Sequence, residues 1–489
     1  MTEFSLMSGG GLIVTIIGWS LILVAFVIVP INRRPTSAMA WLLFVVAVPF
    51  FGFLVFLILG SPKLPKARRK KQQHVTDIIR ERTATRVLPL PETGDDVPEW
   101  FEMIAKLNLN LGAMPLVRGN AAELHDDYNA TILTMAAEVD KAETFVHCEF
   151  YILCLDDTTK PFFTALAAAK ARGVTVRVLM DHVASHGTAY FKETKAELER
   201  MGADWHVMLP FKPIRGQYLR PDLRNHRKLL VIDGKVGFLG SQNLIDRTYD
   251  KKKNIKRGLK WQELVAKVEG PIVEEANALF LTDWYSETDE LLLDTVNLNV
   301  ELKPDRPLLA QIVPSGPGFD NLNNLKMFNS LFYNARKRLS ITSPYFVPEE
   351  SLVSGVTSAA ERGVDVELFV CAIGDQALVW HAQRSYYEVL LRAGVRIYLY
   401  PAPFILHAKH MSMDDHVAVI GSSNMDIRSF ELNLESTLLV YGESFVDDVK
   451  KIEDHYREIS EELTLEAHLE RPFGSRVLDN LARLTSAVQ

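Results

Sequence analysis

The chain has 489 residues, a formal net charge of −7, 48% hydrophobic residues and 24% charged residues. This length predicts two or three domains with packed cores. The acidic balance excludes a bulk basic field for nucleic acid, although local basic patches stay open. Three cysteines, Cys148, Cys154 and Cys371, are too few for a disulfide framework and lack zinc-site spacing. We therefore expect reduced thiols in a reducing compartment.

Two uncharged stretches open the chain, at residues 12–29 and 35–59. A bilayer core of about 30 Å takes roughly 20 helical residues to cross. The stretches predict a two-helix transmembrane hairpin, with a kink or a re-entrant second segment at Pro49. A signal peptide is disfavoured because the first stretch has no basic flank before it and no cleavage site. A pair of buried core helices is the less favoured alternative.

Basic residues set the expected orientation of this hairpin. The turn between the stretches carries Arg33 and Arg34. The segment after the second stretch carries six basic residues: Lys63, Lys66, Arg68, Arg69, Lys70 and Lys71. This excess places the large carboxy-terminal part in the cytoplasm, with the amino terminus on the same side of a multi-pass protein. The basic cluster is expected to lie against anionic headgroups.

Beyond a connector and a first helix at residues 74–110, one pattern of strands and helices occurs twice. The first copy is predicted as a strand at 144–153, a helix at 161–172 and a strand at 174–180. The second copy is predicted as a strand at 339–343, a helix ending at Arg362 and a strand at 364–370. Glycine follows both helices, as expected for a helix end. The pattern predicts an α/β fold of two pseudo-symmetric halves around a parallel or mixed sheet.

The predicted organisation is therefore tripartite: residues 1–72 form the anchor with its basic flank, 73–300 the first α/β half and 301–489 the second. Each half ends in the same constellation. The first reads His226-x-Lys228-x4-Asp233 and then Gly240-Ser241-x-Asn243. The second reads His407-x-Lys409-x4-Asp414 and then Gly421-Ser422-x-Asn424. A single such match would be weak, because a lone histidine beside a strand is usually structural. Two matches with identical glycine offsets indicate one shared catalytic site.

These residue types suit phosphodiester transfer. One neutral imidazole can attack phosphorus, and a second, protonated imidazole can serve the leaving and entering alcohols. Lys228 and Lys409 supply positive charge for the non-bridging oxygens. Neutral donors for the phosphate are Ser241, Asn243, Ser422 and Asn424. Asp233 and Asp414 could fix a ring tautomer. No carboxylate cage is present in the sequence pattern, so neither a metal nor another cofactor is required.

These motifs resemble the phospholipase D superfamily, and nearly the whole chain resembles its bacterial cardiolipin synthase branch. The resemblance rests on four segments: 33–41 with the apolar helix to Gly60, 224–233, Tyr345-Phe-Val-Pro348, and 421–435. It implies two phospholipase D-like halves forming one catalytic unit in a bacterial cell membrane. It implies that His226 is the nucleophile and His407 the acid/base, an order that the residues alone leave open.

The reaction that the resemblance implies uses anionic phospholipid. One phosphatidylglycerol is attacked, a phosphatidyl-histidine forms and glycerol leaves; a second phosphatidylglycerol then accepts the group to give cardiolipin. Membrane and lipid are the expected partners, nucleic acid is not, and the oligomeric state stays open. The first half departs from the pattern because it lacks the arginine-serine and asparagine-glutamate tail of the second. It also carries Glu263 where an aspartate is more usual.

Several supporting features have two interpretations. Four arginines lie in or close to the first motif: Arg215, Arg220, Arg224 and Arg227. They are expected either to bind lipid phosphates or to belong to a solvated loop. The basic run 251–260 suits the membrane surface or a loop. Near the end, a helical stripe is expected to pack on the domain rather than enter the membrane. Its members are Val477, Leu478, Leu481 and Leu484.

Three rival functions remain. Another phosphatidyltransferase or phospholipase D hydrolase would differ in its products. A nuclease is disfavoured by the hairpin and by the charge of −7. A non-catalytic scaffold is disfavoured because both motifs are intact.

Overall fold

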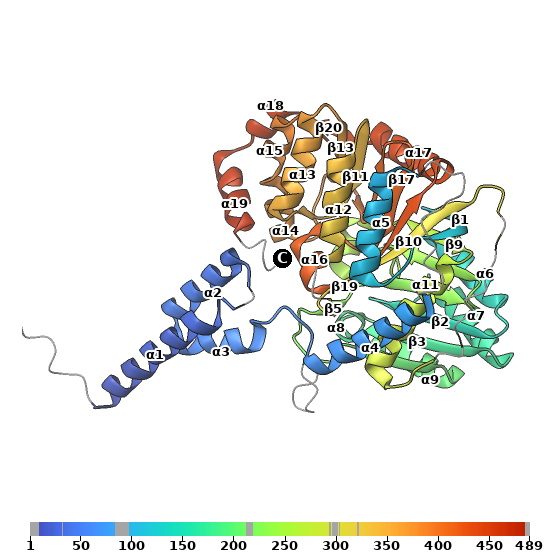
Figure 1. Ribbon diagram of the computed structural model, residues 1–489, viewed down its shortest axis with the longest axis horizontal. Helices are drawn as coiled ribbons and strands as arrows, with labels where there is room; N and C mark the ends of the chain where they lie inside the picture. Colours follow the sequence, from blue (N-terminus) through green and yellow to red (C-terminus); the bar gives the residue numbers. More distant parts are fainter. Residues whose placement is uncertain are drawn as a thin grey trace, which may run out of the picture. The chain divides into compact units, whose positions relative to one another are not determined.

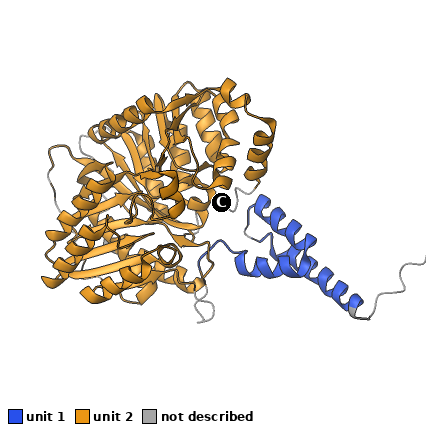
Figure 2. Cartoon of the chain, turned by 180° about the vertical axis from the view of Figure 1, so that it is seen from behind, with its two compact units in different colours: residues 1–64 blue, residues 65–489 orange. Residues whose placement is uncertain are grey.

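The computed structural model describes residues 9–31, 33–83, 97–211, 219–292, 295, 302, 304–319 and 322–484. The chain divides into two compact units, residues 1–64 and 65–489 (Figure 2). Arg215, one of the four arginines expected near the first motif, lies outside the described residues.

The first unit contains α1 (Gly9–Ile28), α2 (Pro35–Ala47) and α3 (Pro49–Leu59). Among the described residues, one helix, over Gly11–Ile28, is long and apolar enough to cross a membrane. The second predicted span is broken, because Val48 leaves helical geometry (φ −140°, ψ 76°) and Pro49 has no N–H to continue the ladder. The break expected at Pro49 is confirmed, but a second helix of spanning length is not found in the described part of this unit.

The second unit contains the two halves. The first half holds α4 (Lys66–Thr83), α5 (Glu99–Gly112), β1 (Val117–His125), α6 (Tyr128–Asp140), β2 (Phe145–Phe150), α7 (Lys160–Ala171), β3 (Thr175–Asp181), α8 (His182–His186), α9 (Phe191–Met201), β4 (Asp204–Met208), β5 (Arg224–Asn225), β6 (Lys228–Ile232), β7 (Val236–Gly240), α10 (Lys252–Arg257), β8 (Lys260–Gln262), β9 (Val265–Glu269) and α11 (Ile272–Thr288).

The second half holds β10 (Leu308–Ser315), α12 (Asn323–Asn334), β11 (Arg338–Thr342), β12 (Phe346–Val347), α13 (Glu350–Glu361), β13 (Asp365–Cys371), α14 (Ala377–Arg384), α15 (Tyr387–Arg392), β14 (Arg396–Tyr400), β15 (Phe404–Leu406), β16 (His410–Met413), β17 (Val417–Gly421), β18 (Met425–Asp426), α16 (Ile427–Glu431), β19 (Asn433–Tyr441), α17 (Glu443–Ile459), β20 (Glu461–Leu463), α18 (Leu465–Leu469) and α19 (Phe473–Arg483).

One mixed sheet runs through both halves (Figure 1). From the centre outward, the first half runs β1-β9-β7-β6-β2-β3-β4 and the second runs β10-β19-β17-β16-β11-β13-β14, with β20 at its edge. The two halves therefore have the same strand order, and they join where β1 pairs antiparallel with β10. In each half three outer strands pair in parallel (β2-β3-β4 and β11-β13-β14), while the inner strands and the edge strand β20 pair antiparallel. The predicted duplicated α/β architecture is confirmed.

The repeated helix ends follow the predicted chemistry. Gly173 and Gly363 have φ of 93° and 89°, a left-handed conformation that favours glycine after a helix. All three cysteines are free and buried. The boundary expected at 300/301 stays a prediction, because the halves share one unit and exchange elements. Phe101 and Ile104 of α5, for example, belong to the hydrophobic core of the second half.

The structure bears on two surface predictions, and it contradicts the second of them. Arg68 makes a bidentate ion pair with Glu287 (2.6 and 2.7 Å), and Lys71 pairs with Asp289 (2.6 Å). These two members of the basic cluster therefore pair with acidic residues of the second unit, and contact of the cluster with headgroups stays a prediction. The expected packing of the α19 stripe is also wrong, since all its members are exposed: Val477 (39%), Leu478 (47%), Leu481 (56%) and Leu484 (80%).

Candidate active site

Short parallel strands carry each motif histidine into the opposite half. β5 pairs with the start of β19, and the His226 N–H then donates to the Leu434 carbonyl (2.8 Å). In the same way β15 pairs with β8, and the His407 N–H donates to the Gln262 carbonyl (2.7 Å). Each histidine is thereby fixed beside the strand that follows the other half's motif.

Each histidine ring meets a buried glutamate from the other half. His226 Nδ1 lies 3.0 Å from both carboxylate oxygens of Glu435. His407 Nδ1 lies 2.8 and 2.9 Å from those of Glu263. A glutamate that accepts from Nδ1–H selects the tautomer whose Nε2 carries the lone pair in the neutral ring. Nε2 is thus the nitrogen available for chemistry in both rings.

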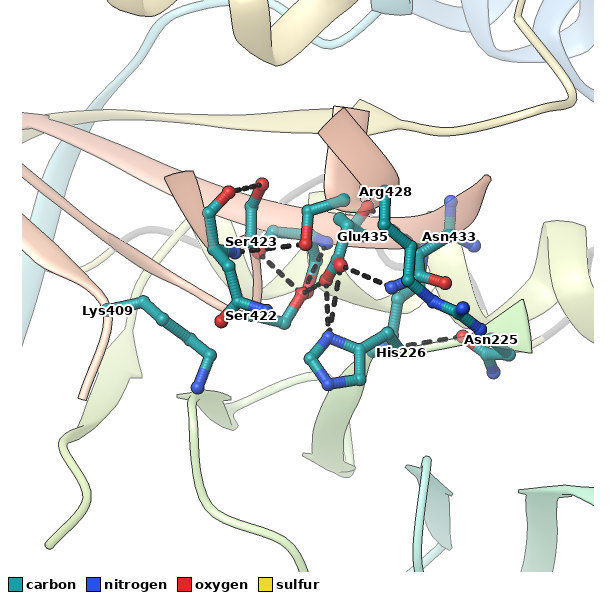
Figure 3. Close-up of polar contacts among 12 residues, drawn as sticks. Asn225, His226, Lys409, Ser422, Ser423, Arg428, Asn433 and Glu435 are labelled. Atoms are coloured by element: carbon teal, nitrogen blue, oxygen red, sulfur yellow. Dashed lines mark hydrogen bonds and ion pairs between the residues drawn. The ribbon is translucent and has the colours of Figure 1, made fainter. Parts of the chain in front are cut away.

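The carboxylate beside His226 is itself held from several sides. Ser422 Oγ donates to Glu435 Oε2, and Asn433 Nδ2 donates to Oε1 (3.3 Å). Figure 3 shows this cluster around the His226 ring, with Arg428 beside it. The ring also has an edge contact with Tyr151, at 4.9 Å between centroids. The imidazole is therefore oriented before any substrate arrives.

Burial and positive charge keep the His226 ring neutral. Burial lowers its pKa well below the usual value, and the charges of Lys228 and Lys409 lower it further. Burial also raises the pKa of Glu435 to about 7, against the charge of Lys228 and the Ser422 hydrogen bond. Of the two histidine–glutamate pairs, His226–Glu435 is therefore the less ionic.

The Glu263–His407 pair is more strongly ionic. Burial alone would raise the pKa of Glu263, but the charge and hydrogen bond of His407 outweigh it and the pKa is lowered. An ionised carboxylate stabilises a protonated imidazole beside it. Burial also lowers the pKa of His407, although the charge and hydrogen bond of Glu263 act against this shift. Of the two rings, His407 is therefore the one whose protonated form has an ionised glutamate beside it.

The two motif lysines are buried beside the histidines. Lys228 Nζ donates to the His226 carbonyl (2.6 Å), and Lys409 Nζ donates to the His407 carbonyl. Burial lowers the pKa of Lys409 to about 8 and that of Lys228 well below its usual value, while Glu435 and Glu263 act against both shifts. Both lysine charges also act on His226, so the lysines of both halves act at one site.

The motif aspartates do not touch the rings, so the prediction that they fix a tautomer is wrong. The Asp233 carboxylate accepts from the N–H groups of Glu143, Thr144 and Phe145 (2.8, 2.8 and 2.9 Å). Asp414 accepts in the same way from three successive N–H groups, those of Arg336, Lys337 and Arg338. Both aspartates have φ of 53°. They clamp the turn after the motif strand to the start of a neighbouring strand.

The four predicted phosphate donors divide into two kinds. Ser422 holds Glu435, while Ser241 Oγ accepts from the Leu264 N–H (3.0 Å) and donates to the Leu264 carbonyl (3.2 Å). Asn243 and Asn424, in contrast, line a cavity of about 680 Å³. Of the four, the asparagines therefore line the cavity, and the serines hold residues around it.

Both histidines line this cavity, together with residues from either half. Tyr151 and Tyr249 come from the first half; Asp375 and Arg428 come from the second. The two imidazoles therefore face one shared space, which the duplicated motifs require. The three described arginines of the first motif bind acidic partners instead: Arg220 binds Asp222, Arg224 binds Asp181, and Arg227 binds Asp283.

Reasoning from the motifs missed the role of the two glutamates. Glu435 stands 14 residues beyond Gly421, whereas Glu263 stands 23 beyond Gly240, so no common offset marks them. The available signal was a lone acidic residue next to an apolar run, as in Glu435-Ser-Thr-Leu-Leu-Val440 and Glu263-Leu-Val-Ala266. A buried charge in such a place needs a partner. Arg428 was missed as a cavity residue for the same lack of a repeated spacing.

Comparison with known proteins gives consistent matches. The family model described as "Cardiolipin synthase, PLD-like domain" matches residues 135–284 and 329–457. A model described as "Phospholipase_D-nuclease N-terminal" matches residues 17–61. A cardiolipin synthase of Clostridium perfringens is 32% identical over 462 residues, which cover 93% of this chain and 94% of that protein. One from Geobacillus kaustophilus is 32% identical, covering 97% and 93% respectively.

A solved structure shares the fold. The crystal structure of a phosphatidylserine synthase from Haemophilus influenzae aligns with a TM-score of 0.60 at 14% identity, covering 79% of this chain and all of that one. At this identity the similarity concerns the fold, which is the same two-half α/β arrangement.

Proposed function

The chain belongs to the PLD-like cardiolipin synthase family, and we propose that it transfers a phosphatidyl group from one phosphatidylglycerol to another, releasing glycerol. One observation carries this proposal: two imidazoles from different halves line one cavity, and each is oriented by a glutamate of the opposite half. Such a pair supplies a nucleophile and a proton carrier at a single phosphorus atom.

In the first step, Nε2 of neutral His226 attacks the phosphorus of phosphatidylglycerol. The bond from phosphorus to the glycerol oxygen breaks, and His407 donates its proton to that oxygen, so glycerol leaves and a phosphatidyl-histidine remains. In the second step, a hydroxyl of another phosphatidylglycerol gives its proton to His407 and attacks phosphorus. His226 is released and cardiolipin is formed. The charges of Lys228 and Lys409 stabilise the non-bridging oxygens in both steps.

The assignment of roles rests on the unequal glutamates. His226 has a strongly lowered pKa and faces a glutamate whose pKa is near 7, which favours the neutral, nucleophilic ring. Burial lowers the pKa of His407 as well, but the charge and hydrogen bond of Glu263 act against that shift, and the lowered pKa of Glu263 keeps its carboxylate ionised beside the imidazolium. The same two roles are compatible with water or another alcohol as acceptor, which would give a hydrolase or a different transferase.

Membrane association is indicated by the apolar helix α1 and by the match over residues 17–61. The proposal places the catalytic unit on the cytoplasmic side of a bacterial membrane, because basic residues dominate the flank after α3. It also assigns the exposed apolar side of α19 to the bilayer surface. α19 packs on α14, whose first residues line the cavity, so one helix separates α19 from the cavity.

The deciding experiment is incubation of the purified protein in phosphatidylglycerol vesicles, with mass analysis for cardiolipin and free glycerol. The unchanged protein should form them in equal amounts. His226→Ala should abolish both products, and His407→Ala should reduce turnover by about 10³-fold. His455→Ala, which removes an exposed histidine, is the matched control and should behave as wild type.

Three results would contradict the proposal. Phosphatidic acid in place of cardiolipin would identify a hydrolase. Salt-sensitive DNA cleavage without lipid turnover would identify a nuclease. Undiminished turnover by either histidine variant would remove the two-histidine mechanism.

A further inference from the structure

The first unit combines one long helix with two short ones. At 1.5 Å per residue, the 20 residues of α1 span about 30 Å, which matches a bilayer core. The 13 residues of α2 and the 11 of α3 span about 20 and about 16 Å. Neither short helix alone crosses the core.

α2 and α3 form an antiparallel pair that turns back on itself. Next to the break, Phe44 meets Phe51 at 6.1 Å between ring centroids; farther away, Trp41 meets Phe56 at 5.5 Å. At the open end, the Arg33 guanidinium donates to the Gly60 carbonyl and also lies over the Phe56 ring. Arg33, two residues before α2, and Gly60, directly after α3, are therefore in contact at the same end of the pair.

The tip of this pair reaches the middle of α1. A Cβ placed on Gly18 would lie 3.9 Å from Pro49 Cβ and 3.8 Å from Phe50 Cε2. Gly18 stands ten residues before Ile28, which is about 15 Å along the helix. Figure 1 shows α1 continuing past α2 and α3. The pair thus covers about half of the length of α1.

The polar groups of this unit suit an apolar medium. Pro49 has no N–H to satisfy, the Val48 N–H donates to Phe44 (3.1 Å), and the Gly52 N–H donates to Val48 (2.7 Å). Within α1, the hydroxyls of Thr15 and Ser20 donate to the carbonyls four residues earlier (2.9 and 2.8 Å). Broken backbone at membrane depth is tolerated where it packs against protein, as it does here against α1.

Charge distribution distinguishes the two ways of inserting this unit. Residues 1–32 contain no lysine or arginine. If residues 35–59 crossed the membrane, Arg33 and Arg34 would lie on the opposite face from the six basic residues at 63–71. If they turn back, all eight basic residues lie on one face, which agrees better with the positive-inside rule.

We propose that this unit crosses the membrane once, through α1, and inserts α2 and α3 as a re-entrant pair reaching the bilayer midplane. The amino terminus then lies on the face opposite to residue 61, in contrast to the topology expected from the sequence. Arg33 fixes the open end of the pair at the cytoplasmic face. This inference rests on the proposed membrane association and not on the chemistry of the cavity.

The test uses three single-cysteine additions, Ser5→Cys, Ile31→Cys and Ser61→Cys, in the full chain. The native cysteines are buried, so the parent protein is the unlabelled control. Each variant is treated with a membrane-impermeant maleimide in right-side-out and in inverted membrane vesicles. We expect Ile31→Cys and Ser61→Cys to react in inverted vesicles and Ser5→Cys to react in right-side-out vesicles.

Two patterns would overturn the proposal. Labelling of Ser5→Cys and Ser61→Cys from one face, with Ile31→Cys reacting from the other, would establish two full crossings. Labelling of all three from one face would exclude a crossing by α1. Cardiolipin formation is measured in the same vesicles, so a failure of the proposed chemistry is seen separately from a failure of the topology.

Discussion

Lys409 has a pKa of about 8 because burial works against its charge. A lysine is charged below its pKa and neutral above it, so the part of the stabilisation of the phosphate oxygens that Lys409 supplies should be lost as pH rises through about 8. We expect kcat/KM for transfer to fall along that limb. Lys409→Arg, which stays charged, should be slower because its shape differs, but its basic limb should move to higher pH.

The matched control for this pH series is Lys451→Arg, which changes an exposed lysine (75%). Its profile should overlay that of the unchanged protein. A basic limb that stays in place in Lys409→Arg would assign the limb to another group.

Asp233 offers a second prediction, because three backbone N–H groups depend on its carboxylate. Asp233→Ala leaves them without this acceptor and should lower the free energy of unfolding by about 3 kcal/mol. Thermal melting of the detergent-solubilised protein measures this loss. Turnover per folded molecule should stay within about threefold of wild type.

The exposed Asp140→Ala is the control for surface charge and should leave the melting temperature unchanged. A variant of Asp233 that is stable but inactive would instead give this residue a chemical role.

These residues show how far single positions could be interpreted from the sequence. The histidines and asparagines line the common cavity, and the lysines lie beside the histidines, because the motif spacing is local and occurs twice. The glutamates and the roles of the aspartates could not be predicted, because both depend on contacts between distant segments. His226 and Glu435, for example, are 209 residues apart.

At the scale of elements, α19 shows why an amphipathic pattern does not fix which side is buried. Its inward side is anchored by polar contacts: Asp479 pairs with His381 (2.7 Å) and Arg471 (2.6 Å), next to buried Ala482. These polar contacts hold the Asp479 side of α19 inward, and the leucine side faces outward. The apolar stripe is visible in the sequence. The contact that fixes its direction could not be predicted, because it joins Asp479 to His381 of α14.

The leucine side leads to a prediction on lipid access. Replacing Leu478 and Leu481 together with serine removes two exposed leucines and should reduce transfer in phosphatidylglycerol vesicles by about tenfold. Burial of even part of two leucine side chains is worth at least the roughly 1.4 kcal/mol that this factor represents. With monomeric short-chain phosphatidylglycerol the rate should be unchanged.

Asn480→Ser, on the same helix, is the matched control and should not alter either rate. Equal losses with vesicles and with monomeric lipid would indicate damage to the catalytic unit rather than loss of membrane contact.

At the scale of the whole molecule, the halves of the catalytic unit are expected to unfold together. β1 and β10 join their sheets, and α5 of the first half contributes to the core of the second. Hydrogen exchange at increasing denaturant should therefore expose β2 and β13 at the same midpoint. Two separated midpoints would show that the halves are independent folding units.

The duplicated architecture could be predicted because the same strand, helix and glycine order recurs about 190 residues apart. The packing of α5, a helix of the first half, into the core of the second half could not be predicted. An amphipathic helix does not specify which of two similar cores it packs against. The break at Pro49 was visible in the sequence, but its consequence depends on the contacts of Gly18 and Arg33, which are tertiary.

The crossed pairing of histidines and glutamates has a consequence for how such chains can be recombined. A chimera joined near residue 300 from two related parents would combine each parent's imidazole with the carboxylate of the other. If one parent carries the shorter aspartate where Glu263 stands, the ring beside it loses its partner although both motifs remain intact. Functional hybrids should therefore be those whose parents agree at these two acidic positions.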